Sequence, residues 1–302
     1  MIQEYFCSLL SAQAQESLHA TASHGEVWFL LENHGIWEGK AFEQSDIPGA
    51  LKNHLSAVVR ATPGSRVLMI KSGHGRMASG ISFFIVHSRE TSSAIYEFTV
   101  QRYEEILDLD IQAVLDDSEL YRPSLRKEPL YLICTNGKRD PCCAKFGMPV
   151  YAAMLAQVGS QVWQSSHVGG HRFAANLVCF PHGLYFGRLT PGNVKQVLDR
   201  YQQGKIHLEF YRGRACYPEE VQAAEYHLRR ETGELGLEAF TFQDFEQQGE
   251  DTWLVRFREA ASGRQHQLHI QRELSNLELP QSCLKAETSP LVTYHLLQHS
   301  ST

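Results

Sequence analysis

The sequence lacks the features that mark several functional classes. No apolar run in its 302 residues approaches the roughly 20 residues that a membrane-spanning helix needs. Basic residues are not in excess: the formal net charge is -6, which argues against a general nucleic-acid-binding protein. The start, MIQEYF, has neither the basic residues nor the apolar core of a signal peptide, and its acidic residue argues against a transit peptide. We therefore expect a cytoplasmic protein with neither a nucleic-acid nor a membrane partner.

The arrangement of the cysteines does not favour disulfide bonds. The chain has 7 cysteines, an odd count, and two of them are adjacent at Cys142 and Cys143. In a chain without a secretion signal, such cysteines are expected to be reduced and used for metal binding or redox chemistry. The hydrophobic content of 43% is ordinary for a globular protein, and the length leaves room for two domains.

Hydrophobic periodicity divides the chain into three stretches. Residues 1–126 read as β-α-β-β-β-α, and residues 127–232 read as β-α-β-(α)-β-β-α, the order of a thioredoxin-like sheet. Residues 233–302 read as a small β-rich extension that ends in a tail from Pro280. We therefore predict an α/β protein with two thioredoxin-like halves, of which only the second carries ligands, followed by a β-rich appendage.

The individual elements follow from the same patterns. Helices are predicted at 50–60, 103–115, 146–158, 191–203 and 218–230, with a single helical turn at 172–177. Strands are predicted at 27–31, 66–70, 81–86, 94–100, 130–134, 161–165, 177–180, 184–187, 252–257 and 265–270.

Four residues of the second stretch make a complete ligand set for a metal centre. Cys134 ends a predicted buried strand, and a loop rich in turn-forming residues brings the chain back to Cys143. The segment His167-Val-Gly-Gly-His171 follows, and its paired glycines, Gly169 and Gly170, favour a loop that brings the backbone close to a metal or sulfide. Their N–H groups are free to bond cluster sulfurs. Thiolate and imidazole ligands select zinc or iron–sulfur over magnesium or calcium.

Three other readings of these residues stay open on composition alone. A structural zinc site uses the same two cysteines and two histidines. A vicinal-thiol redox site at Cys142 and Cys143 is less favoured, because adjacent cysteines close a strained ring and the usual motif is C-x-x-C. In the third reading, these are ordinary buried cysteines and polar loop histidines.

Several further residues are weaker candidates. Lys138, Arg139 and Arg172 flank the ligands, where they would raise a cluster potential, dock an acidic partner or simply be solvated. Asn176 is a candidate for contact with the ligand loop or for a helix cap, and Arg212-Gly-Arg214 is a basic turn that could face the centre. The remaining positions receive no role: Cys179 is expected in the core, Cys7, Cys216 and Cys283 are isolated, and His266 and His269 are expected on the surface.

The runs CTNGKRDPCCA at 134–144 and SSHVGGHRFAAN at 165–176 resemble the sucrase/ferredoxin-like family. A C-x8-C pair followed by H-x-G-G-H is a rare combination, and the resemblance covers the second stretch closely and the first loosely. It implies a thioredoxin-like ferredoxin in which histidines replace the second cysteine pair. A [2Fe–2S] cluster would be held by Cys134, Cys143, His167 and His171. Cys142 would be a free thiol beside the site or replace Cys143 as ligand, although the spacing favours Cys143.

The function that we expect from this resemblance is one-electron transfer to a redox partner protein whose identity the sequence does not give. Two alternatives remain: an oxidoreductase that uses the cluster or Cys142, and a structural or interaction module that binds Zn²⁺. Sucrose cleavage is not expected, because glycoside hydrolysis uses two positioned carboxylates and no stretch presents such a pair.

Overall fold

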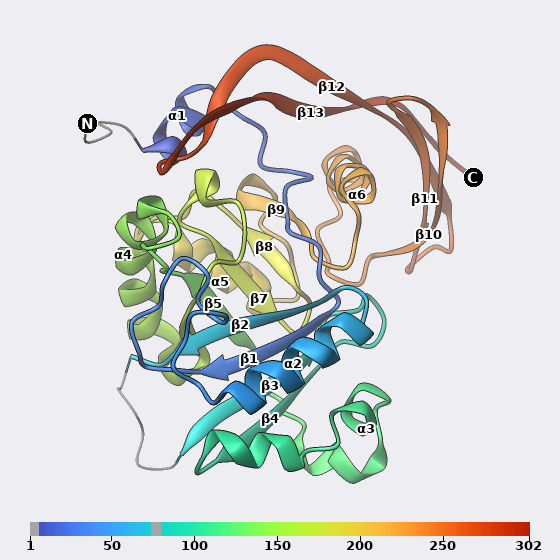
Figure 1. Ribbon diagram of the computed structural model, residues 1–302. Helices are drawn as coiled ribbons and strands as arrows, with labels where there is room; N and C mark the ends of the chain where they lie inside the picture. Colours follow the sequence, from blue (N-terminus) through green and yellow to red (C-terminus); the bar gives the residue numbers. More distant parts are fainter. Residues whose placement is uncertain (1–5, 74–79) are drawn as a thin grey trace.

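The computed structural model describes residues 6–73 and 80–302 (Figure 1). A nine-stranded mixed sheet with helices on its faces forms the body, and a separate four-stranded sheet lies beside it. The predicted α/β class is therefore confirmed. The expectation about the N-terminal leader rests on residues 1–6, and residues 1–5 lie outside the described part. None of the described helices is long and apolar enough to cross a membrane.

The two halves of the large sheet repeat one pairing pattern. In each half the first two strands are parallel, the third is antiparallel to the first, and the fourth is antiparallel to the third. The halves join where β2 pairs with β6 in antiparallel fashion, and the sheet order is β4-β3-β1-β2-β6-β5-β7-β8-β9. The strands of this sheet are β1 (Val27–Glu32), β2 (Ser65–Lys71), β3 (Ile81–His87), β4 (Ala94–Val100), β5 (Leu130–Cys134), β6 (Val162–Ser165), β7 (Leu177–Phe180), β8 (Leu184–Phe186) and β9 (Tyr211–Arg214).

The helices that the sequence predicted differ from the observed ones mainly at their ends, and the helix at Cys7–Gln13 was not predicted. The helix expected at 103–115 is instead two short pieces, because the Asp110 side chain accepts from the Ala113 N–H at 3.0 Å and starts a new helix. The turn expected at 172–177 is η4 (His171–Phe173). The α-helices are α1 (Cys7–Gln13), α2 (Gly49–Ala61), α3 (Ile111–Leu115), α4 (Pro141–Val158), α5 (Val194–Gln202) and α6 (Glu219–Thr232), and the other 3-10 turns are η1 (Tyr103–Asp108), η2 (Glu119–Ser124), η3 (Gly159–Gln161) and η5 (Leu208–Phe210).

Helix α4 begins five residues before the predicted 146, and this shift matters for the site. Asp140 caps the helix by accepting the Cys142 N–H at 2.9 Å, and Pro141 takes the first helical position, where its missing N–H costs nothing. The adjacent Cys142 and Cys143 therefore lie in the first turn of a helix and not in a loop.

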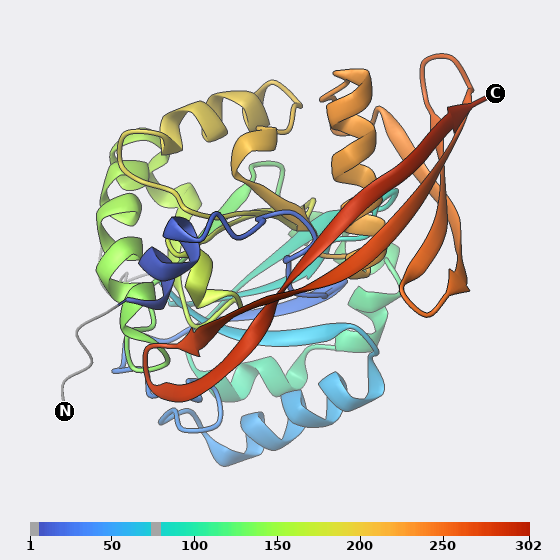
Figure 2. The ribbon, with the colours of Figure 1, turned by 90° about the horizontal axis from the view of Figure 1, so that it is seen from above.

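The expected tail after Pro280 is wrong. Residues 265–301 form one long hairpin of β12 (Gln265–Ser282) and β13 (Lys285–Ser301), which continues the small sheet of β10 (Phe240–Gly249) and β11 (Thr252–Glu259). We call the part of this hairpin from 271 to 295 the arm. Figure 2 shows that it crosses the large sheet and that its tip lies close to α1. His266, expected on the surface, is only 4% exposed and packs against His299.

The core places β5 between two packed layers. Tyr131 and Ile133 pack with α4 and α5, whereas Leu132 and Cys134 face the opposite side, toward residues such as Trp163. All five residues of β5 are buried, as the sequence predicted. Cys134 is thus fixed at the carboxyl end of an interior strand.

Candidate metal centre

Strand β5 and helix α4 present two thiols to one place. Cys134 ends β5, and its N–H donates to the Asn176 carbonyl at 3.2 Å. Cys143 lies in the first turn of α4, and its sulfur is 3.7 Å from Nδ1 of His167. Because successive helical residues point about 100° apart, the neighbouring Cys142 side chain points elsewhere. The structure thus brings Cys143, and not Cys142, to His167.

Three of the four predicted ligands are in mutual reach. The Cys134 sulfur is 3.9 Å from Nδ1 of His167, and the ligand atoms of Cys134, Cys143 and His167 all lie within 4.8 Å of one another. Both cysteines are buried, while His167 is partly exposed. This trio is a compact set of sulfur and nitrogen donors of the kind that soft and borderline metals prefer.

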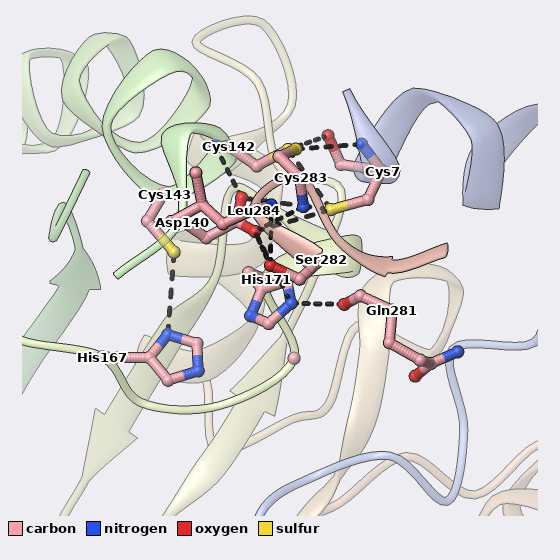
Figure 3. A network of polar contacts seen from close by, with 12 residues as sticks. Cys7, Asp140, Cys142, Cys143, His167, His171, Gln281, Ser282, Cys283 and Leu284 are labelled. Carbon is pink, nitrogen blue, oxygen red and sulfur yellow. Dashed lines mark hydrogen bonds and ion pairs between the residues drawn. The ribbon is translucent and has the colours of Figure 1, made fainter. Parts of the chain in front are cut away.

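His171 lies beside the trio and keeps one nitrogen free. Its ring centroid is 5.2 Å from that of His167, and the two rings lie near Cys143 in Figure 3. Nε2 of His171 contacts the Gln281 carbonyl oxygen at the tip of the arm, so this nitrogen carries the proton. Nδ1 is buried and has no hydrogen-bond partner among the described residues. A neutral imidazole held in this way has its Nδ1 lone pair available for a metal.

Electrostatics at the site favour one thiolate. A hydrogen bond with Cys143, together with His167, lowers the pKa of Cys134 well below its ordinary value. The same hydrogen bond, with burial, raises the pKa of Cys143. The pair therefore shares one proton, and a bound cation would replace it.

A buried carboxylate lies next to His171. Asp140 Oδ2 is 3.7 Å from Nε2 of His171. Burial alone would raise the pKa of Asp140, but hydrogen bonds from the N–H groups of Cys283 and Cys142 lower it overall. Burial lowers the pKa of His171 despite this neighbour, so the ring stays neutral as a ligand must be.

Hydrogen bonds from Arg212 and Asn176 hold the glycine loop between the histidines. Gly169 and Gly170 have φ values of +107° and +69°, a region that disfavours other residues. Arg212 donates from Nη1 to the Gly169 carbonyl at 3.2 Å and to Asn176 Oδ1 at 2.8 Å. Asn176 in turn donates to the Gly170 carbonyl at 2.8 Å. Arg212 and Asn176 therefore set the path of the loop that carries both histidines.

The comparison with known families identifies the family of this chain. The profile of the family described as sucrase/ferredoxin-like matches residues 18–213, well over half of the chain and all four candidate ligands. The chain belongs to the sucrase/ferredoxin-like family. Curated relatives match shorter segments of this chain than the family profile does. No solved structure gives a significant match.

Curated relatives include yeast proteins named altered inheritance of mitochondria protein 32. The one from Saccharomyces kudriavzevii is 32% identical over 96 residues, which are 27% of this chain and 31% of the relative. The one from Meyerozyma guilliermondii is 37% identical over 98 residues, which are 28% of this chain and 34% of the relative. The one from Candida glabrata is 28% identical over 114 residues, which are 33% of this chain and 36% of the relative. The matched segments thus span about a third of these relatives.

The three basic residues near the ligands have different surroundings. Arg172 forms an ion pair with the buried Glu16 at 2.8 Å and stacks on Phe173. Lys138 and Arg139 are exposed. Arg139 and His167 line a cavity of about 420 Å³, together with Lys40, Arg60, Arg66 and nine other residues. His167 therefore borders a hollow with four basic side chains and one acidic side chain, Glu43, while His171 borders a second hollow of about 330 Å³.

Sequence reasoning missed some residues and misplaced others. Asp140 received no role, although the Asp-Pro pair is a helix-start signal that could have revealed it. The contact of the Gln281 carbonyl could not be predicted, because a backbone group that the tertiary fold brings to the site leaves no pattern in the sequence. The predicted basic turn at 212–214 is instead the buried strand β9. Cys7 and Cys283, expected to be isolated, lie together, whereas Cys179 is in the core as predicted.

Proposed function

We propose that this protein is an electron carrier that binds a [2Fe–2S] cluster through Cys134, Cys143, His167 and His171. The observation that carries the proposal is Nδ1 of His171, which is buried and has no hydrogen-bond partner within residues 6–73 and 80–302. It lies beside three sulfur and nitrogen donors that are already within 4.8 Å of one another. Two thiolates and two imidazoles fit an iron–sulfur cluster of the Rieske type in donor chemistry. The cluster, when bound, would supply one-electron redox chemistry.

We propose that each half of the large sheet is thioredoxin-like, with the second half as the ferredoxin domain. The repeated strand order and pairing, parallel then antiparallel twice, support it. In this arrangement the ligands come from the end of the first strand of the half, the start of its helix and the loop after β6.

The protein's own residues would hold and orient the ligands. The Gln281 carbonyl keeps the Nε2 proton on His171 and leaves Nδ1 as donor. Arg212 and Asn176 fix the loop between the histidines. His167 borders the cavity with four basic side chains, whereas His171 borders a second hollow of about 330 Å³ with two arginines, so we propose that electrons pass on the His167 side. The charges there favour a partner with an acidic surface. We also propose a cytoplasmic location, which seven free cysteines support.

The test is film voltammetry of anaerobically purified protein. We expect a reversible one-electron couple within about −150 to +300 mV, above the roughly −400 mV of all-cysteine ferredoxins of the plant type. His171→Cys and His167→Cys should each lower the potential, because a thiolate donates more charge than a neutral imidazole. Cys216→Ser, at a cysteine that packs against a different hydrophobic cluster with none of the four ligands, should leave the potential unchanged. A protein without a redox couple, or histidine variants with the wild-type potential, would contradict the proposal.

A further inference from the structure

A second group of thiols gathers from three distant parts of the chain. Cys7 comes from α1, Cys142 from the first turn of α4, and Cys283 from the tip of the arm (Figure 3). The Cys142 sulfur lies 3.6 Å from that of Cys7 and 3.3 Å from that of Cys283. Both carboxylate oxygens of Asp140 lie 4.0 Å from the Cys7 sulfur. One ligand atom from each of these four residues lies within 4.8 Å of the others.

The group is enclosed and already has hydrogen bonds around it. All four residues are buried, with Cys142 and Asp140 at 0% exposure. The Ser8 hydroxyl donates to the Cys142 sulfur at 3.2 Å, and the Cys7 N–H lies 3.2 Å from the Cys283 sulfur. Donors directed at sulfur are the outer-shell contacts that stabilise metal-bound thiolates.

We propose that Cys7, Cys142, Cys283 and Asp140 bind a Zn²⁺ ion in a second, structural site, separate from the cluster site. Zinc takes thiolate and carboxylate ligands in tetrahedral sites, and zinc–sulfur bonds of about 2.3 Å place neighbouring sulfurs roughly 3.8 Å apart. The observed sulfur separations need only small adjustments to reach that value. A carboxylate in the set favours zinc over Cu(I), which prefers sulfur alone. A disulfide would use two of the sulfurs and leave the third without a role.

The site would fasten the arm to the body of the protein. Cys283 is two residues from Gln281, whose carbonyl contacts His171. Asp140 also accepts a hydrogen bond from the Ser282 hydroxyl at 3.0 Å. A metal bound here therefore ties α1, α4 and the arm tip together and fixes one support of the cluster site. Cys7 and Cys283 both lie outside residues 18–213, the part that matches the family profile.

The experiment separates this site from the first centre. The full-length Cys134→Ser/Cys143→Ser variant, which loses both thiols of the cluster site, is purified under reducing conditions with zinc supplied, and its metals are measured by mass spectrometry. About one zinc ion per chain is expected. Adding Cys283→Ser or Cys7→Ser should remove most of it, whereas adding Cys216→Ser, which replaces a cysteine outside the group, should not.

The wild-type background gives a second, independent readout. There, Cys283→Ser should lower the zinc content while the iron content and visible absorption persist, so failure of the cluster proposal and failure of this one give different results. Circular dichroism verifies that each variant is folded. If the first background does not fold, Co²⁺ titration of metal-stripped wild type, Cys283→Ser and Cys216→Ser replaces it, because thiolate–cobalt bands count the sulfurs bound. Absence of zinc, iron in its place, or equal metal content in Cys283→Ser and Cys216→Ser would overturn the proposal.

Discussion

At the scale of single residues, Gly170 has little freedom to change. Its φ is +69°, and an added Cβ would lie 2.2 Å from Nη2 of Arg212, the side chain that supports the histidine loop. We expect Gly170→Ala to destabilise the fold by about 1–3 kcal/mol and to reduce the iron retained per chain. Urea unfolding and iron analysis measure the two effects.

The matched control is Gly192→Ala in the same half of the sheet. There the nearest atom to an added Cβ is Thr190 Oγ1 at 3.8 Å, and no positive φ is required. This variant should keep wild-type iron and stability within about 0.5 kcal/mol. Equal behaviour of the two alanine variants would show that the loop path does not depend on Gly170.

The sequence was informative about residues whose partners lie in the same half. Cys134 could be placed because a strand ends at it, and the two glycines at 169–170 correctly predicted a loop between the histidines. Cys7 and Cys283 could not be paired, since 276 residues separate them and neither lies in a recognisable pattern. Their proximity depends on where the arm ends, which is a property of the tertiary fold.

At the scale of elements, α6 is anchored to β9 by a buried charge network. Glu225 accepts the Tyr211 hydroxyl at 2.7 Å and lies 3.0 Å from Arg229 and 3.7 Å from Arg214. Because removal of its charge leaves two buried guanidinium groups unpaired, Glu225→Gln should cost about 3–5 kcal/mol of unfolding free energy. Glu231→Gln, an exposed change on the same helix, should cost little. Similar losses in both variants would argue against the network as the anchor.

The same network predicts how this loss depends on pH. Burial would raise the pKa of Glu225, but Arg229 and Arg214 lower it overall. A carboxyl with a lowered folded-state pKa contributes stability that is present above its unfolded pKa, roughly 4.3, and disappears as pH falls through the folded value. The stability difference between wild type and Glu225→Gln should therefore be largest above about pH 5 and shrink in acid. Urea titrations at pH 7 and in acid test this, and a difference that grows on acidification would contradict it.

Elements were predictable where burial imposes a period and unpredictable where hydrogen bonds alone define them. The buried strand β5 was found with its observed bounds, because all its residues are apolar and enclosed. The predicted start of α4 was five residues too late. The first turn of the helix is defined by the Asp140 cap and shows no apolar periodicity. Much of the arm is exposed on both faces, so its sequence resembles that of a tail.

At the scale of the whole molecule, the charge around the cavity should govern access to the site. The chain is acidic overall, yet Arg139, Arg66, Arg60 and Lys40 line the hollow that His167 borders. Oxidation of the reduced protein by hexacyanoferrate, an anion, should slow as salt screens charges over about 10 Å. Arg139→Glu should slow it about several-fold and speed oxidation by the hexaammine cobalt(III) cation. Stopped-flow absorption measures both rates.

The control for this electrostatic effect is Arg200→Glu, an equal charge change at an exposed position of α5 outside the cavity lining. It should change either rate much less than Arg139→Glu does. If the two variants respond equally, net charge and not the cavity determines access.

The central claim is that Cys134, Cys143, His167 and His171 hold an iron–sulfur cluster. Its most direct test is iron, sulfide and visible-absorption analysis of anaerobically purified wild type, with single serine variants at three cysteines. We predict a coloured protein with about two iron and two sulfide ions per chain. Cys134→Ser and Cys143→Ser should abolish the colour, whereas Cys142→Ser should keep most of the iron. A colourless wild type that binds zinc at these residues, or loss of iron in Cys142→Ser but not in Cys143→Ser, would contradict the account.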